Sequence, residues 1–183
     1  TAAAGLGIVD AARASDVALA AALTRAGVQW GGFVADLKDD AAVAALLPAV
    51  IEQFGVAPSL IVNNASQFEW DDPATATQAA LEEHFSVNAA APVALCTALA
   101  RHLGEGETAV VVNILDQRIR HPAGDQLSYT ISKLALAGAT EALARAPLRL
   151  RNEIIDSTAE AGSVPESTVS LSAYATSSAF IPS

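Results

Sequence analysis

The chain has 183 residues, of which 52% are hydrophobic, so it can bury the core of one domain and is not expected to be disordered. Its formal net charge of -10, with no visible basic patch, argues against nucleic acid as a partner, and no apolar run approaches the roughly 18 residues of a membrane span. Cys96 is the single cysteine, which excludes an internal disulfide and fits a reducing cytoplasm, where we expect the protein to be.

Stretches with helical periodicity alternate with short apolar stretches along the chain. The expected helices cover 16–26, 39–54, 77–101 and 128–145, and the expected strands cover 28–35, 60–62, 108–115 and 148–155. Pro48 and Pro92 predict a kink or break in their helices. Continuous apolar strands between helices indicate one doubly wound α/β domain of Rossmann type over residues 1–183, with a parallel sheet and helices on both faces. The tail from residue 157 is assigned to no element.

Polar residues end two of the predicted strands. Asn63 and Asn64 follow one of them, and Asp116 follows another. Ligands of open α/β sheets bind beyond the carboxyl ends of the strands. These residues are therefore expected at one functional edge.

Tyr129 and Lys133 lie one helical turn apart and share a helix face. An ammonium group beside a phenol favours the phenolate and lowers the tyrosine pKa from about 10 toward working pH. Such a tyrosine can exchange a proton during hydride transfer. The pair alone also fits an ordinary amphipathic helix, and its place after a polar strand end favours the catalytic interpretation.

Other polar residues are interpreted more plainly. His84, His102 and His121 lack metal-ligand spacing, so we expect no metal site. Asp71 and Asp72 are interpreted as a solvated loop.

Four segments together resemble the short-chain dehydrogenases/reductases, over residues 28–145. They are "SYTISKLAL", "LIVNNAS", "HFSVNAAAP" and "ADL" at 35–37. The resemblance implies a nicotinamide-dependent oxidoreductase in which Tyr129 donates a proton, Lys133 lowers its pKa and holds the nicotinamide ribose, and Asn88 supports a water chain. It also implies a homotetramer built through 77–101 and 128–145. The positions that would line the cofactor are Gly5, Leu6, Gly7, Asp36, Leu37, Asn63, Asn64 and Ala65, together with Tyr129 and Lys133.

At two positions the sequence differs from most of the family and is similar to the pteridine reductases, which are a subgroup of it. Asp116 stands where the family has serine, and the turn after residue 62 reads "NNASQF". This resemblance implies that Ser66, Phe68, Asp116 and Tyr129 face the substrate, a pterin or dihydrofolate-like ring that accepts hydride at a C=N bond. Phe68 could instead be a packing residue and Asp116 a turn former. A carbonyl reductase or alcohol dehydrogenase, and a non-catalytic member of the family, remain the alternatives.

The amino-terminal "TAAAGLGIVD" departs from the family's glycine-rich phosphate loop. The glycine spacing is one residue short, and the helix expected after the loop is missing. We interpret the chain as lacking parts of the glycine loop and helix and of the carboxyl-terminal substrate loop, with breaks expected between Gly7 and Ile8 and between Ile155 and Ser163. A truncated, inactive protein is the alternative.

Two residues near the amino terminus point to different cofactors. Asp10 favours NAD(H), whereas Arg13 favours NADP(H). Pteridine reductases use NADPH, so NADP(H) is preferred.

Overall fold

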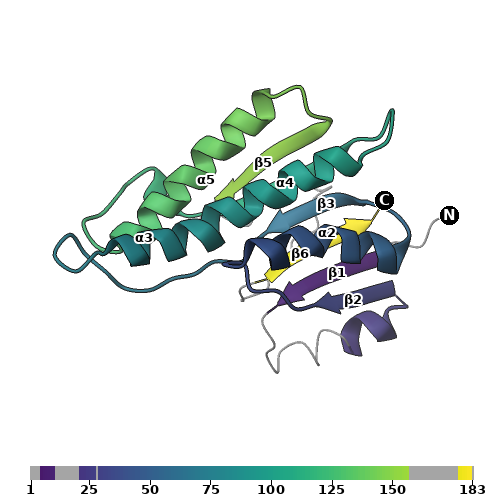
Figure 1. The fold of residues 1–183 in the computed structure, drawn as a ribbon, viewed down its shortest axis with the longest axis horizontal. Coiled ribbons are helices and arrows are strands. Elements are labelled where there is room, and N and C mark those ends of the chain that lie inside the picture. Colours follow the sequence, from purple (N-terminus) through teal and green to yellow (C-terminus); the bar gives the residue numbers. More distant parts are fainter. Residues whose placement is uncertain (1–4, 11–20, 28, 157–176, 183) are drawn as a thin grey trace.

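The computed structural model describes residues 5–10, 21–27, 29–156 and 177–182. Six strands within these residues form one sheet in the order β2-β1-β6-β3-β4-β5 (Figure 1). The strands are β1 (Gly5–Asp10), β2 (Gln29–Phe33), β3 (Pro58–Asn63), β4 (Ala109–Leu115), β5 (Leu150–Asp156) and β6 (Ser177–Pro182). All run parallel except β6, which is antiparallel to both β1 and β3. The predicted α/β class is therefore confirmed, with one antiparallel strand added.

Strand β1 contains the residues that the sequence assigned to a phosphate loop. Gly5, Leu6 and Gly7 pair with β2 in a parallel ladder, and Gly7 also pairs with β6. The structure joins Gly7 and Ile8 as consecutive residues of this one strand. That a segment is missing between them stays a prediction. The structure thus places Gly5, Leu6 and Gly7 in a ladder and not in a turn, and a backbone that pairs in a sheet does not turn to approach a diphosphate as a glycine loop does. Their contact with the cofactor stays a prediction. The second expected break and Arg13 lie outside the described residues.

Helices α2, α4 and α5 lie beside one another across the sheet (Figure 1). The helical segments are α2 (Asp40–Phe54), α3 (Gln78–Phe85), the π-helical turn η1 (Ser86–Ala90), α4 (Ala91–His102), the 3-10 turn η2 (Gln117–Ile119) and α5 (Leu127–Arg145). Of the helix expected at 16–26, the described part is helical at 21–25, and Gly27 follows with φ of 69°. The sequence also predicted helices on the opposite face of the sheet, and that part of the expectation stays a prediction.

Helix α2 follows from its local sequence. The Asp39 side chain caps its start by accepting from the Ala41 amide, and Gly55 ends it at a φ of 76°. Its buried residues are Val43, Leu46, Leu47 and Val50, which recur at helical spacing. Pro48 does not break the helix as expected. It lies on the exposed side with Ala44, where water can bind the carbonyl that lacks an intrahelical partner.

The long helical segment after Thr77 is irregular where the sequence placed a break. Thr77 caps α3, and the widened turn η1 joins α3 to α4 just before Pro92. Pro92 has no amide hydrogen to donate, and the π turn accommodates this without ending the helical path. The turn brings Asn88 to a fully buried position.

The main core lies between α2, α4 and the strands beneath them. Its fully buried members include Leu47, Ile61, Leu95, Leu99 and Val111. The core fixes β3 and β4 side by side, so that their carboxyl ends present polar residues at one edge.

Candidate active site

Tyr129 and Asp116 meet where β4 ends and α5 begins. The Tyr129 hydroxyl donates to Asp116 Oδ2 at 3.2 Å, and the backbone amide of Arg118 donates to Asp116 Oδ1 at 2.9 Å. Asp116 therefore forms the turn into η2 and also contacts the predicted catalytic tyrosine. The two interpretations of Asp116 from the sequence are compatible, because each carboxylate oxygen has its own donor.

The electrostatic surroundings keep Tyr129 protonated. Burial raises the pKa of Tyr129 above its ordinary range, and the negative charge and hydrogen bond of Asp116 raise it further, against smaller opposing effects of Ser66 and Arg118. The expected lowering of this pKa by Lys133 does not appear. Lys133 Nζ lies over the ring, 5.7 Å from its centroid.

Lys133 is almost fully buried on α5. Its Nζ donates to the carbonyl oxygen of Ile114 at 3.0 Å, so the ammonium group is held against the end of β4. Burial lowers the pKa of Lys133 to about 8, and the Asp116 carboxylate limits the fall.

Asn88 joins three parts of the site. Its Oδ1 accepts from the Gln67 amide at 2.7 Å and from Ser66 Oγ at 3.3 Å. Its Nδ2 donates to the Gln67 carbonyl and to Ser132 Oγ, both at 2.9 Å, and Ser132 Oγ donates to the Tyr129 carbonyl at 2.6 Å. These contacts use both donors and both acceptor positions of the amide, so Asn88 links the loop after β3 to α5.

Phe68 packs against the ring of Tyr129. The two ring centroids are 5.0 Å apart and the rings meet edge to face at 81°. Phe68 is 54% exposed, so it is not a core residue. The structure thus brings together Ser66, Phe68, Asp116 and Tyr129, the four residues predicted to face substrate.

Asn63 and Asn113 are register partners at the ends of β3 and β4. Asn63 Nδ2 donates to Asn113 Oδ1 at 2.8 Å, and Asn113 Nδ2 donates to Thr140 Oγ1 at 2.8 Å. Asn63 Oδ1 is buried without a hydrogen-bond partner among the described residues. The sequence analysis did not identify Asn113 and Thr140, although an asparagine within the apolar run "VVVNIL" was a signal for Asn113.

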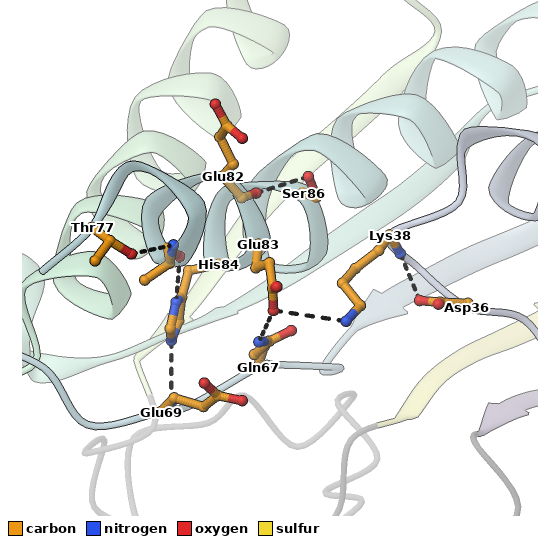
Figure 2. A network of polar contacts seen from close by, with 10 residues as sticks. Asp36, Lys38, Gln67, Glu69, Thr77, Glu82, Glu83, His84 and Ser86 are labelled. Carbon is orange, nitrogen blue, oxygen red and sulfur yellow. Dashed lines mark hydrogen bonds and ion pairs between the residues drawn. The ribbon is translucent and has the colours of Figure 1, made fainter.

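Asp36 and Leu37, which were predicted to line the cofactor, are connected to the loop after β3. Asp36 is exposed and accepts from the Lys38 amide, while Leu37 packs against the core. Lys38 pairs with Glu83 at 3.7 Å, and Gln67 Nε2 donates to the same carboxylate oxygen at 3.1 Å (Figure 2). The end of β2 is thereby connected to the loop that carries Ser66 and Phe68.

Two buried polar residues of the site were not predicted. Asp71, expected in a solvated loop, is 5% exposed and accepts hydrogen bonds from Ser128 at the start of α5. His84 is buried, with Nε2 accepting from the Glu69 amide at 3.1 Å and Nδ1 donating to the Ala80 carbonyl (Figure 2).

Neither a metal cluster nor a membrane helix is found in the described part of the chain. It has no group of three His, Cys, Asp or Glu side chains that could hold a metal ion. Its helices are too short or too polar to cross a membrane.

Residues 1–178 match the family model described as short chain dehydrogenase. Among curated proteins, the chain is 26% identical over 130 residues to the uncharacterized oxidoreductase YjdA of Bacillus subtilis. That match covers 69% of this chain and 51% of the relative.

Solved structures also resemble this chain. FolM alternative dihydrofolate reductase 1 from Brucella canis, complexed with NADP, is 33% identical with a TM-score of 0.72, over 83% of this chain and 61% of that one. The corresponding protein of Brucella suis, also with NADP, is 33% identical with a TM-score of 0.73, over 83% and 63%. A short chain dehydrogenase from Burkholderia cenocepacia with NADP is 30% identical with a TM-score of 0.73, over 82% and 62%. The chain therefore spans about three fifths of these neighbours and half of the curated relative.

Proposed function

We propose that this chain, which belongs to the short-chain dehydrogenase family, is a reductase that transfers hydride from NADPH to the C=N bond of a pterin or dihydrofolate-like ring. The observation that carries the proposal is the position of Tyr129 between Asp116 and Phe68. A protonated phenol, hydrogen-bonded to a carboxylate and bordered by an exposed aromatic ring, suits a flat ring that needs a proton at nitrogen. Two similar structures are of proteins titled alternative dihydrofolate reductases, which supports this substrate class.

We propose the following roles for the residues of this chain in the reaction. The reduced nicotinamide supplies the hydride when bound. Tyr129 donates a proton to the ring nitrogen, because its raised pKa keeps the phenol protonated at neutral pH. Asp116 accepts a hydrogen bond from that hydroxyl and so orients it. After Tyr129 has given up its proton, Asp116 can pass a proton from solvent to the phenolate. Ser66 and Phe68 would contact the substrate ring.

One end of the proposed cofactor site suits a nicotinamide ribose. Asn63 Oδ1 is a buried acceptor with no partner in the described part of the chain, and Lys133 is a buried donor on the same edge. We propose that these two residues hold the ribose and amide end with Asn64, Ala65 and Tyr129, and that Asp36 and Leu37 border the adenine.

For the diphosphate of the cofactor, the described residues offer no comparable set of contacts. Gly5, Leu6 and Gly7 lie in β1, so no diphosphate contact is assigned to them. The choice of NADP(H) over NAD(H) is supported by the NADP in the three similar structures.

The assembly and location of the protein are part of the proposal. Ile131 and Leu134 on α5 are 42% and 40% exposed, which supports self-association through α4 and α5. We propose a cytoplasmic homotetramer, and sedimentation of the purified chain measures its mass directly.

The function can be tested with binding and turnover assays. NADPH and NADH are titrated into the protein while nicotinamide fluorescence is followed, and turnover is then compared between a dihydropterin and an aliphatic ketone. We expect tighter binding of NADPH and turnover of the dihydropterin. A preference for the ketone would assign a carbonyl reductase, and absence of binding by either cofactor would assign a non-catalytic member of the family.

A further inference from the structure

We infer that Asp71 is a positioning residue for Tyr129 and acts through the first turn of α5. The Ser128 amide donates to both carboxylate oxygens of Asp71 at 3.2 Å, and Ser128 Oγ also donates to Oδ2. Ser128 immediately precedes Tyr129, and both Asp71 and Ser128 are buried. The inference rests on the proposed role of Tyr129 as proton donor.

Asp71 takes the place of a local helix cap. The residue at the cap position of α5 is Gln126, which makes no side-chain capping hydrogen bond. Helix starts usually have such a cap, because the first amide groups lack intrahelical partners. Here a carboxylate 57 residues earlier in the chain accepts from the Ser128 amide instead.

The backbone of Asp71 also binds the turn that precedes α5. Its carbonyl oxygen accepts from the Gln126 amide at 2.7 Å. Gln126 has a φ of 53° and a ψ of 49°, and within the described ranges no other non-glycine residue has a positive φ. L-residues rarely adopt this left-handed conformation, so the turn needs contacts that hold it. Asp71 therefore fixes both the direction and the first turn of α5.

Asp71 also connects this turn to the loop that carries Phe68. Asn88 binds the backbone of Gln67 at the loop's start, and His84 accepts from the Glu69 amide further along (Figure 2). Asp71 provides the third attachment, to α5. Because Phe68 and Tyr129 are brought together by these two segments, loss of the Asp71 contacts is expected to shift Tyr129 relative to Phe68 and Asp116.

The neighbouring Asp72 offers a matched control. Its carboxylate accepts from the Ala74 amide, the Thr75 amide and Thr75 Oγ1, all within its own turn. Asp71 and Asp72 are thus adjacent carboxylates that both stabilise a turn, and only the carboxylate of Asp71 contacts α5.

The test uses Asp71→Ala, Asp71→Asn, Ser128→Ala and Asp72→Ala in a Tyr174→Phe background. The chain has two tyrosines, so fluorotyrosine incorporated in this background reports Tyr129 alone by fluorine NMR. We expect the Tyr129 resonance of Asp71→Ala to move toward that of solvent-exposed fluorotyrosine. We also expect kcat with a dihydropterin to fall roughly 10- to 100-fold, as misplacement of a reacting group does, while Kd for NADPH changes little. Asp71→Asn keeps an acceptor for the Ser128 amide and should restore part of kcat, and Asp72→Ala should match the parent.

The outcomes separate this inference from the proposed function. The fluorine signal needs neither cofactor nor substrate, so it decides the role of Asp71 even if the protein turns over no pterin. If Asp71→Ala does not fold, Asp71→Asn and Ser128→Ala carry the comparison. A folded Asp71→Ala or Ser128→Ala variant with an unmoved Tyr129 resonance would overturn the inference. So would a kcat equal to that of Asp72→Ala where the parent is active.

Discussion

Tyr129 donates its hydroxyl hydrogen to Asp116 across the junction between α5 and β4, with 3.2 Å between Tyr129 Oη and Asp116 Oδ2. Burial and this carboxylate both raise the pKa of Tyr129, so the phenol remains protonated near neutral pH. A protonated phenol can act as an acid toward a substrate but not as a base. The contact therefore favours reduction as the proposed direction of the reaction.

Replacing Tyr129 with phenylalanine removes the proton donor and keeps the ring that meets Phe68. We expect kcat to fall by about 10²- to 10⁴-fold, the usual contribution of a positioned acid. The Kd for NADPH, measured by nicotinamide fluorescence, should stay nearly unchanged. A variant that keeps most of its rate would remove Tyr129 from the mechanism.

Asp116→Ser introduces the residue that the sequence comparison expects at this position of the family. Serine can still accept from the Arg118 amide, but it lacks the charge that faces Tyr129. We expect kcat/KM for a dihydropterin to fall by about 10²-fold, the lower end of acid–base contributions. Turnover of a ketone, if any, should be kept or rise.

The matched control for this change is Asp125→Ser, which removes a carboxylate of the same loop that pairs with the Arg118 guanidinium at 2.8 Å. Equal losses for Asp116→Ser and Asp125→Ser would indicate loop damage and not loss of a group beside Tyr129.

Phe68→Ala should weaken a planar ligand more than a small aliphatic one. Aromatic contacts contribute about 0.5–1.5 kcal/mol beyond area burial, which corresponds to roughly twofold to tenfold in affinity. The measurement is the Kd of a pterin and of an aliphatic ketone for both proteins. Phe85→Ala is the control, because Phe85 is similarly exposed at 49% but lies on α3. Equal losses for both ligands would speak against a pterin site.

The burial of Lys133 predicts a pH dependence of stability. Its pKa falls from 10.5 to about 8 on folding, so between these pH values the unfolded chain binds more protons than the folded one. The cost of burying the charge is full below about pH 8 and is relieved as the pH rises toward 10.5. Relative to Lys133→Met, the wild type should gain about 3 kcal/mol of unfolding free energy across this window.

Urea unfolding of wild type and Lys133→Met at several pH values measures that difference. Comparing the two proteins cancels the titration of Cys96 and Tyr129, which are common to both. A difference that does not change with pH would mean that Lys133 is not a buried ammonium group in the folded protein.

Elements with complete local signals were predicted well from the sequence. Helix α2 has its cap at Asp39, a buried stripe at helical spacing and Gly55 at its end, and its observed bounds follow these signals. The placement of Tyr129, Asp116 and Phe68 at one site was also predicted, because family resemblance supplied the spatial relation that spacing along the chain does not.

Features that depend on distant partners were missed. Asp71 is buried only because Ser128, 57 residues later, binds it, and nothing in "DD" distinguishes it from the partly exposed Asp72. Strand β6 has no apolar alternation of its own and is stabilised by pairing with β1 and β3 on both sides. Gly5 and Gly7 resembled a phosphate loop by composition, but the surrounding strands decide their conformation.

The most direct measurement of the central claim follows the hydride itself. The wild-type protein is mixed with a dihydropterin and with NADPH that carries deuterium at the transferable position of the nicotinamide, and the product is examined by mass spectrometry. The proposed function predicts a reduced pterin with deuterium on the ring carbon, formed by the wild type and at least about 10²-fold more slowly by Tyr129→Phe. A protein that binds NADPH but gives no deuterated pterin, or a Tyr129→Phe variant that forms it at the wild-type rate, would contradict the account.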